Sequence, residues 1–379
     1  MKRMKRAGDF RPMIPQGVQC YFGEEVNRRR KVESILAAIM KNWGFDEIIL
    51  PFFDYVESFS YGLGSELGDK AYRFLDKDGS LLALRPDLTT LVGKTVATRM
   101  RGQPLPIQLF YSGEVFRQER AGAGKQKESY QIGLELMGVG EPHADIEILL
   151  VAIDCLLHLG VKEFKIALGH VGFFNGIVQQ LNLSEEKAGA LRDAIDHKDT
   201  AWLKSQVEDL QLSDDKKRFL IDVPNLAGGR EILELALGIV ENPRSRQALL
   251  DLRKTAEVLN ALGLSDFLTF DLAEVRGLDY YTGIVFKIYG HSLGFEMGGG
   301  GRYDGLLGRF GWDLPAVGFS FTLDRILPLL ADVTGLQVPL HEAEPHEIAT
   351  SSGDLTGFFR QAWELRQQGL RVRLGGTAP

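Results

Sequence analysis

A polar and aromatic octet stands directly before a stretch that is typical of a buried strand. It reads Arg276-Gly277-Leu278-Asp279-Tyr280-Tyr281-Thr282-Gly283. A β-turn with its aromatic rings in the core would explain the tyrosines. It would also leave a charged pair next to a sheet, and proteins seldom keep such charges without a partner. We therefore interpret the octet as part of a binding site for a polar ligand.

A second cation, Arg117, lies where another predicted strand gives way to a loop, in Val115-Phe116-Arg117-Gln118-Glu119-Arg120. A guanidinium held by a strand can bind a carboxylate or phosphate through two parallel hydrogen bonds. A strand-end arginine is nevertheless more often a solvated charge. The nearby Lys125 does not belong to a phosphate-binding loop, because the GxxxxGK[ST] spacing is absent and Gln126 follows it.

Helices and paired strands must position these residues. Apolar residues at helical spacing predict a helix from about Glu24 to Trp43, followed by a strand at 47–50 that stops at Pro51. Asp145 is expected to cap a buried, apolar helix that ends at Gly160. The predicted hairpins are 71–76 with 80–85, and 107–117 with 129–137.

The composition changes from about Asn182 to Gly263, where Leu, Ala, Lys, Glu and Asp recur with helical periodicity. We interpret this stretch as a helical insertion. Strand character returns at 283–289, before a run of four glycines and a strand-to-helix unit at 316–330. After Pro339 we expect one helix, 355–368, and one short strand, 371–374.

The overall composition is that of a globular protein, with 44% hydrophobic and 25% charged residues among 379. A net charge of −7 lowers the expectation of tRNA binding, which needs cations against phosphates. Cys20 and Cys155 are far apart and indicate neither a disulfide framework nor a metal site. No secretory signal or membrane span is expected, so we predict a cytoplasmic protein. We expect neither a metal nor a cofactor.

Several segments resemble, in chain order, the histidyl-tRNA synthetases, which are class II synthetases. The octet and Gly300-Gly301-Arg302-Tyr303-Asp304-Gly305-Leu306 resemble two histidine-specific signatures. The helix and strand ending at Pro51 resemble motif 1, Phe116-Arg117-Gln118-Glu119 motif 2, and 315–325 motif 3. Leu84-Arg85-Pro86-Asp87-Leu88-Thr89 resembles the segment that holds the substrate amino group. The resemblance covers roughly residues 8 to 330.

The resemblance implies an α+β fold: a class II aminoacyl-tRNA synthetase-like antiparallel sheet flanked by helices, with a helical insertion. We expect a core at 1–330 that includes the insertion at about 182–263. A small C-terminal extension, 331–379, would follow. It is too short for the anticodon-binding domain of a synthetase.

The resemblance also implies a pocket for free histidine. The matching residues are Asp87, Thr89, Arg117, Gln131, Glu135, Arg276, Tyr280 and Tyr281. Asp87, Thr89 and Gln131 would hold the ammonium. Glu135 and Tyr281 would contact the imidazole. The two arginines would bind the carboxylate, and Tyr280 would lie beside the pocket. Gln131 and Glu135 are four apart on one predicted strand, so they should face the same side. Alternatively, these residues form a structural polar network in a pocket that binds nothing.

The sequence departs from the synthetase pattern around the expected ATP site. Thr322 replaces a motif 3 glycine, Asp324 is the acid of that motif, and Leu88 replaces a glycine beside Thr89. The motif 2 loop also lacks the usual basic and aromatic pattern and includes Glu128. Arg117 and Arg325 remain, so some ATP affinity stays open.

A shortened, synthetase-like chain of this kind resembles the regulatory subunits of ATP phosphoribosyltransferase. That resemblance implies no catalytic residues, a class II-like dimer, and a hetero-oligomer with the short-form catalytic subunit in histidine biosynthesis. Histidine would be the feedback effector, and neither tRNA nor a membrane would bind. The alternatives are a truncated histidyl-tRNA synthetase or another histidine-activating enzyme, and a histidine-binding module with an unrelated partner.

Overall fold

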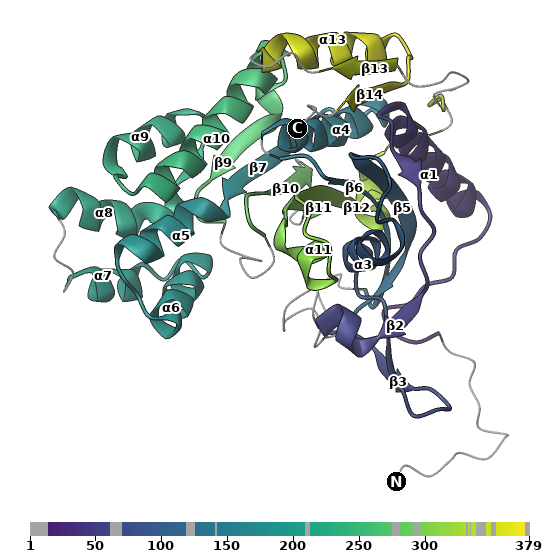
Figure 1. The fold of residues 1–379 in the computed structure, drawn as a ribbon, viewed down its shortest axis with the longest axis horizontal. Helices are drawn as coiled ribbons and strands as arrows, with labels where there is room; N and C mark the ends of the chain where they lie inside the picture. Colours follow the sequence, from purple (N-terminus) through teal and green to yellow (C-terminus); the bar gives the residue numbers. More distant parts are fainter. Residues whose placement is uncertain are drawn as a thin grey trace.

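A nine-stranded sheet forms the centre of the part of the molecule that the structure describes (Figure 1). Its strands, in spatial order, are β1 (Asp46–Glu47), β5 (Ile107–Phe116), β6 (Glu128–Met137), β12 (Ala316–Thr322), β11 (Glu296–Arg302), β10 (Ile284–Gly290), β7 (Phe164–His170), β9 (Leu268–Asp271) and β8 (Ala227–Gly228). The β1–β5 and β7–β9 pairs are parallel and the other pairs are antiparallel. The expected class II-like antiparallel sheet is therefore confirmed.

The computed structural model describes residues 14–60, 70–118, 126–140, 142–208, 213–274, 281–290, 296–330, 333, 335–338, 346–349 and 354–375. None of the helices in these ranges combines the length and apolar character that crossing a membrane requires.

The two faces of the sheet are covered by different helices. Helices α1 (Glu24–Asn42) and α4 (His143–His158) pack on the face that carries Ile132, Leu134 and Phe321. The opposite face belongs to a second apolar cluster, which includes residues of α3 (Thr89–Arg99) and α11 (Gly305–Arg309). Because side chains alternate along a strand, β6 turns its odd-numbered residues 131, 133 and 135 towards this second face.

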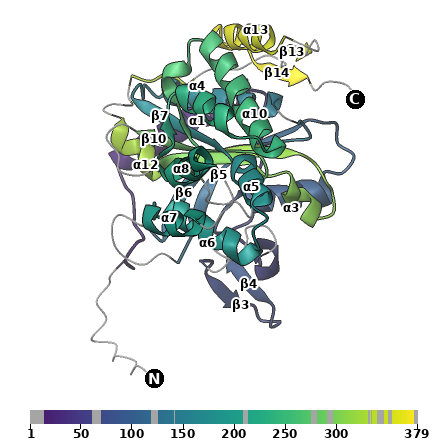
Figure 2. The ribbon, with the colours of Figure 1, turned by 90° about the vertical axis from the view of Figure 1, so that its left-hand side faces the viewer.

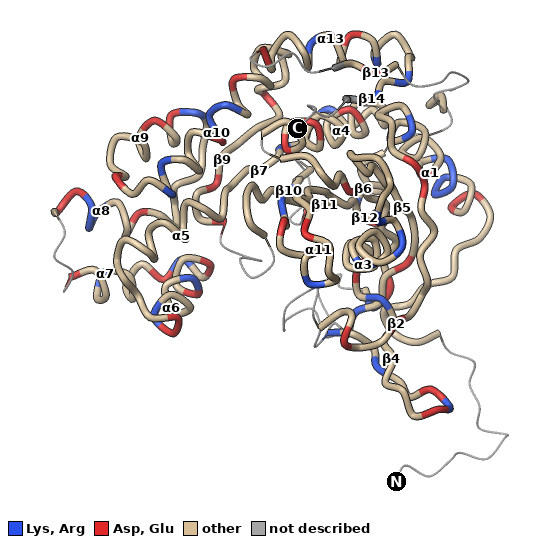
Figure 3. The backbone as a smooth tube through the Cα atoms, viewed as in Figure 1, with Lys and Arg blue, Asp and Glu red and all other residues tan. Residues whose placement is uncertain are grey.

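Helices of the chain's middle third extend from one end of the sheet, and Figure 2 turns them towards the viewer. They are α5 (Val171–Gln180), α6 (Glu185–Asp196), α7 (Thr200–Glu208), α8 (Asp214–Asp222), α9 (Glu231–Ile239) and α10 (Pro243–Ala261). Helices α6, α8 and α10 each carry both acidic and basic side chains (Figure 3).

A small three-stranded sheet lies beside this core, at the lower right of Figure 1. It consists of β2 (Phe53–Tyr55), β3 (Arg73–Leu75) and β4 (Leu81–Leu84), in the order β2-β4-β3. The antiparallel β3–β4 pair confirms the predicted hairpin across Asp78-Gly79.

Two sequence-based expectations need correction, and the glycine run receives a position. The strand predicted at 47–50 is only the two-residue β1, because the chain turns towards the small sheet. Asp145 does not cap α4, which begins at His143. Its carboxylate instead pairs with Arg302 inside the protein. The four glycines lie within strand β11, where two neighbouring strands flank them closely.

The C-terminal residues pack against the core through a buried arginine. Helix α13 (Leu355–Gln367) lies beside the parallel pair β13 (His346–Ala349) and β14 (Val372–Gly375). Its Arg366 is 5% exposed, with Cζ 3.4 Å from the centroid of the Trp43 ring at the end of α1. The Arg366 guanidinium donates to the Val372 carbonyl at 2.8 Å and lies 3.9 Å from the Glu147 carboxylate.

Burial disfavours both charges of this contact. It lowers the pKa of Arg366 to about 10 and raises the pKa of Glu147 to about 7, while each charge favours the charged form of the other. A buried charge that loses its partner is strongly destabilising. The ion pair therefore makes the packing of α13 against α1 and α4 sensitive to single substitutions.

We predict that Arg366→Met lowers the free energy of unfolding by about 3–5 kcal/mol, because Glu147 is left buried without a cation. Urea unfolding near neutral pH measures the loss. Arg360→Met, at an exposed position of the same helix, is the control. Adding Glu147→Met to Arg366→Met should restore most of the stability. Equal losses for Arg366→Met and Arg360→Met would contradict the prediction.

Candidate functional site

The Glu135 carboxylate is at the centre of the candidate site. It lies on β6, is 1% exposed, and accepts hydrogen bonds from two phenols. Tyr111 donates to Oε1 at 3.0 Å and Tyr303 donates to Oε2. Gly318 lies opposite Glu135 on β12, and a Cβ added there would stand 1.7 Å from Oε2. The glycine therefore lets this carboxylate lie against the neighbouring strand.

Burial dominates the electrostatics of this carboxylate. It raises the pKa of Glu135 to about 8, and the negative charge of Asp87 adds to the rise. Hydrogen bonds from Tyr303, Thr89 and Tyr111 act in the opposite direction, because they stabilise the ionised form. Thr89 Oγ1 also lies 3.4 Å from the Tyr111 hydroxyl. Glu135 is thus a buried acid surrounded by hydroxyl groups.

Asp87 and Arg117 form a second charged part of the site. The Thr90 amide donates to Asp87 Oδ1 at 3.3 Å at the start of α3, and Arg117 Nε donates to the Pro86 carbonyl at 2.8 Å. Burial raises the pKa of Asp87 to about 6, against the opposing charge of Arg117. The carboxylate and the guanidinium therefore interact across the gap between α3 and the end of β5.

Tyr281 and Gln131 extend the site along the sheet. Burial raises the pKa of Tyr281, and so do the negative charges of Glu135 and Asp87. Its ring lies over β11, since a Cβ added to Gly301 would stand 2.8 Å from it. Gln131 is 8% exposed and lies two alternations before Glu135 on the same face of β6.

The structure thus brings together most of the residues proposed from the sequence. Thr89, Asp87, Arg117, Glu135 and Tyr281 interact directly or through their charges, as described above. Gln131 joins them by strand register. Arg276 and Tyr280 lie outside the described residues. The histidine-binding role of all eight remains a prediction.

Sequence reasoning missed two members of the site, Tyr111 and Tyr303. Tyr303 stands inside the second signature and could have been proposed from it. Tyr111 carried only a weak signal, as one aromatic residue in an apolar strand. A Cβ added to Gly133, which pairs with Tyr111 across β5 and β6, would stand 2.8 Å from its hydroxyl. The absent side chain gives that hydroxyl access to Glu135.

The arginine of the second signature has a structural position. Arg302 is 1% exposed, and it forms a 2.7 Å ion pair with Asp145 of α4 and a 3.0 Å pair with Asp304. The Asp304 carboxylate also accepts from the Ala316 amide at 2.9 Å. Arg302 and Asp304 thereby fix the segment that carries Tyr303 between β11 and β12.

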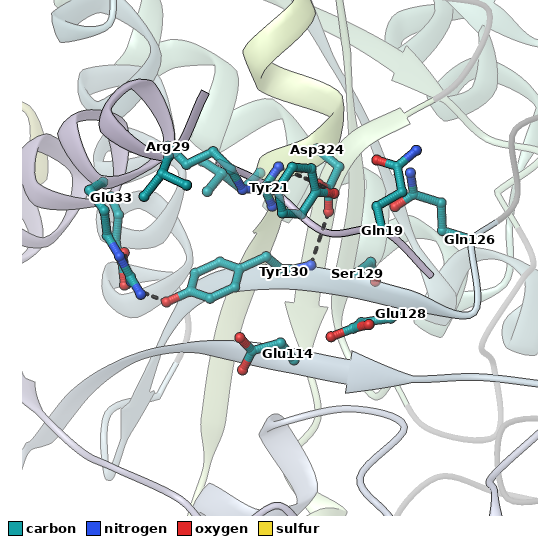
Figure 4. Close-up of a pocket in the computed structure, with 13 residues that line it drawn as sticks. Gln19, Tyr21, Arg29, Glu33, Glu114, Gln126, Glu128, Ser129, Tyr130 and Asp324 are labelled. Carbon is teal, nitrogen blue, oxygen red and sulfur yellow. Dashed lines mark hydrogen bonds and ion pairs between the residues drawn. The ribbon is translucent and has the colours of Figure 1, made fainter. Parts of the chain in front are cut away.

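A cavity of about 180 Å³ lies beside α1, β5 and β6 (Figure 4). By strand alternation, its Tyr130 faces the side of the sheet opposite Glu135. Its walls are Gln19, Tyr21, Val26, Arg29, Arg30, Glu33, Glu114, Gln126, Glu128, Ser129, Tyr130, Leu323 and Asp324. Of the proposed site residues that the structure describes, none lines it. The Tyr130 hydroxyl donates to Glu33 and its amide donates to Asp324 at 3.0 Å, so Tyr130 of β6 is bonded to two residues of the cavity wall.

The motif 3 charges are already engaged by the protein. Asp324 pairs with Arg29 of α1 at 2.7 Å and accepts from the Tyr21 hydroxyl at 3.2 Å. Arg325 donates to the Glu296 carbonyl at 2.7 Å and lies 3.6 Å from its carboxylate. Thr322 ends β12 opposite Gln131. The acid therefore points to the cavity side and the arginine is held by β11.

We predict that Glu135 makes the ligand-free protein less stable as the pH rises. Its folded-state pKa of about 8 exceeds the ordinary value of about 4.3, so its stabilising contribution is complete below about pH 4 and is lost as the pH rises through about 8. Relative to Glu135→Gln, the wild type should lose on the order of a few kcal/mol between about pH 5 and about pH 9.

Urea unfolding of both proteins at the two pH values measures this difference. Exposed Glu163→Gln provides the control for the loss of one carboxylate. A wild-type minus variant difference that is the same at both pH values would show that the Glu135 carboxyl titrates normally.

Known proteins share sequence and fold with this chain. The family model described as histidyl-tRNA synthetase matches residues 17–326. The ATP phosphoribosyltransferase regulatory subunit of Syntrophotalea carbinolica is 41% identical over 319 residues, which are 84% of this chain and 74% of the relative. The protein of the same name from Desulforamulus reducens is 37% identical over 361 residues, covering 95% and 88%.

Solved structures show the same fold. A Bacillus halodurans protein described as an ATP phosphoribosyltransferase regulatory subunit/histidyl-tRNA synthetase superimposes with a TM-score of 0.78 at 31% identity, covering 97% of this chain and 93% of that one. Histidyl-tRNA synthetase from Nostoc sp. superimposes with a TM-score of 0.70 at 21% identity, covering 98% and 87%, and so supports the fold alone. The chain therefore belongs to the ATP phosphoribosyltransferase regulatory subunits, a family built on the histidyl-tRNA synthetase fold.

Proposed function

We propose that this chain is a non-catalytic regulatory subunit that binds histidine in the site around Glu135 and assembles with the short-form catalytic subunit of ATP phosphoribosyltransferase. The observation that carries the proposal is the convergence of an acid–arginine pair and an acid–phenol group in one buried site. Histidine biosynthesis would be controlled through this subunit, in the cytoplasm.

The charges of the site complement free histidine. The ammonium needs an anion and neutral acceptors, which Asp87, Thr89 and Gln131 offer. The carboxylate needs a cation, and Arg117 lies next to Asp87. The imidazole has a donor and an acceptor nitrogen, which Glu135 and Tyr281 can complement. Paired polar contacts of this kind discriminate strongly against ligands that lack the matching groups.

The contacts of the motif 3 residues support a function in which histidine is not activated with ATP. Asp324 is paired with Arg29, Arg325 is held by Glu296, and a branched side chain stands at Thr322. Arg117 and Arg325 nevertheless keep a histidine-activating enzyme as the second candidate. ATP–pyrophosphate exchange that depends on histidine would favour that enzyme over a regulatory subunit.

The partner follows from the family. Relatives carry the name of the regulatory subunit of ATP phosphoribosyltransferase, and a regulatory subunit requires a catalytic one. Histidine binding would shift the complex from one of two conformations towards the other. The coupling free energy between two sites of this kind is typically about 1–3 kcal/mol. The effect on activity would therefore be graded.

Self-association is proposed through the segment that resembles motif 1. Ile49, Phe52, Phe53 and Tyr55 follow α1 and are 91%, 53%, 51% and 54% exposed. Arg85 holds this turn, because it donates to the Leu50 carbonyl at 2.8 Å and its Cζ lies 4.4 Å from the Phe52 ring centroid. Large apolar side chains gathered on a rigid surface are typical of a protein interface.

We predict that Asp87→Asn weakens histidine binding by about tenfold to a hundredfold, because the ligand ammonium loses its anionic partner. Calorimetry of the purified chain with histidine measures the affinity. In the complex with the short catalytic subunit, the same variant should assemble normally but should require a correspondingly higher histidine concentration for inhibition. Asp78→Asn, in the β3–β4 turn, is the control. No histidine binding by the wild-type chain would overturn the proposed function.

We predict that the double variant Ile49→Lys/Phe53→Lys converts a dimer into a monomer, because charges are introduced into the apolar contact. Light scattering coupled to gel filtration measures the mass. Leu235→Lys changes an exposed apolar residue of α9 that is 49% exposed and should leave the dimer intact. A monomeric wild type, or a dimeric double variant, would place self-association elsewhere.

A further inference from the structure

We propose that Tyr111 and Tyr303 are positioning residues that make Glu135 an acceptor for a ring N–H and thereby set the preference for an imidazole. This inference rests on the proposed function and names the part of the site that reads the ligand's ring. Nothing in the sequence pattern assigned a role to either phenol.

The two phenols approach Glu135 from different strands and bond to different oxygens. Tyr111, on β5, donates to Oε1, whereas Tyr303, directly after β11, donates to Oε2. Gly318 of β12 provides the space beneath Oε2. The carboxylate is therefore fixed in orientation by one phenol from β5 and one from the segment after β11, in the space that β12 leaves.

These contacts determine which hydrogen bonds remain for a ligand. An ionised carboxylate has about two acceptor positions on each oxygen, and one phenol occupies one position on each. Since both phenols donate, the carboxylate can satisfy them without carrying a proton of its own. Its remaining positions can accept from an N–H of the ligand. When Glu135 is ionised, an aromatic ring without nitrogen would leave these remaining acceptor positions without a donor.

The third phenol of the site, that of Tyr281, has a different role. Burial raises the pKa of Tyr281, and the negative charges of Glu135 and Asp87 raise it further. Its hydroxyl thus lies within electrostatic range of the carboxylate and suits the second ring nitrogen. Tyr111 and Tyr303 act through Glu135, whereas Tyr281 would touch the ligand itself.

The supporting side chains are themselves held in place. Arg302, next to Tyr303, pairs with Asp145 at 2.7 Å, and Asp304, on its other side, accepts from the Ala316 amide. The Tyr111 hydroxyl passes over Gly133. The geometry that directs both phenols at Glu135 is therefore built into the sheet and does not depend on a ligand.

The test compares histidine with β-(2-thienyl)alanine, which has a similar five-membered ring without nitrogen. Calorimetry is performed on wild type, Tyr111→Phe and Tyr303→Phe. Each variant should lose about tenfold to a hundredfold in histidine affinity, because a hydrogen bond to a charged group is lost. Affinity for the thiophene analogue should stay the same or increase. Equal losses for both ligands would show a merely structural role and overturn the proposal.

Tyr130→Phe is the matched control, since its phenol also donates to a carboxylate, that of Glu33, but on the opposite face of the same strand. This variant should leave the ratio of the two affinities unchanged. A change equal to that of Tyr303→Phe would overturn the specific role of the two positioning phenols.

A second measurement needs no ligand. Carboxyl ¹³C NMR of the ligand-free chain follows the titration of Glu135, and each Tyr→Phe variant should raise its pKa further, because a donor to the ionised form is removed. An unchanged pKa would overturn the positioning roles even where histidine binds. Failure of the wild type to bind histidine would overturn the proposed function, and the preference for imidazole with it.

Discussion

The constraint that organises this molecule is the burial of Glu135 inside a sheet. A carboxylate that is removed from water needs hydrogen-bond donors in place of the water. Here the donors come from three separate segments: Tyr111 lies on β5, Tyr303 directly after β11, and Thr89 at the start of α3. Each donor needs an unobstructed approach. Gly318 and Gly133 provide it, because any side chain at these positions would occupy the space of the Glu135 carboxyl or the Tyr111 hydroxyl. The glycines around the site thus serve close approach more than backbone flexibility.

Because side chains alternate along β6, the candidate site and the cavity residue Tyr130 lie on opposite faces of the sheet. Gln131, Gly133 and Glu135 face α3 and α11, whereas Tyr130 and Ile132 face α1 and α4. The motif 3 acid, Asp324, is tied to α1 by Arg29 on the cavity side. A charge that could have served nucleotide chemistry therefore stabilises the packing of α1 against the sheet, which agrees with a regulatory family on a synthetase fold.

Much of the framework could be predicted from the sequence. The helix from Glu24, the two hairpins and the buried α4 followed from apolar periodicity and turn residues, because these signals are local. The predicted start of α4 and the predicted length of β1 were wrong. Asp145 looked like a cap only because its partner, Arg302, lies 157 residues away. Short range patterns do not show a partner at that distance.

For the site, residue types and signatures were sufficient to nominate Asp87, Thr89, Arg117, Gln131, Glu135 and Tyr281, because each belongs to a recognisable motif or to one strand face. The tertiary structure alone decided that Tyr111 and Tyr303 hold the two oxygens of Glu135, and that Asp324 and Arg325 are engaged by α1 and β11. The physical reason is that hydrogen bonds and burial depend on strand register and close approach. Those quantities exist only once distant segments lie side by side.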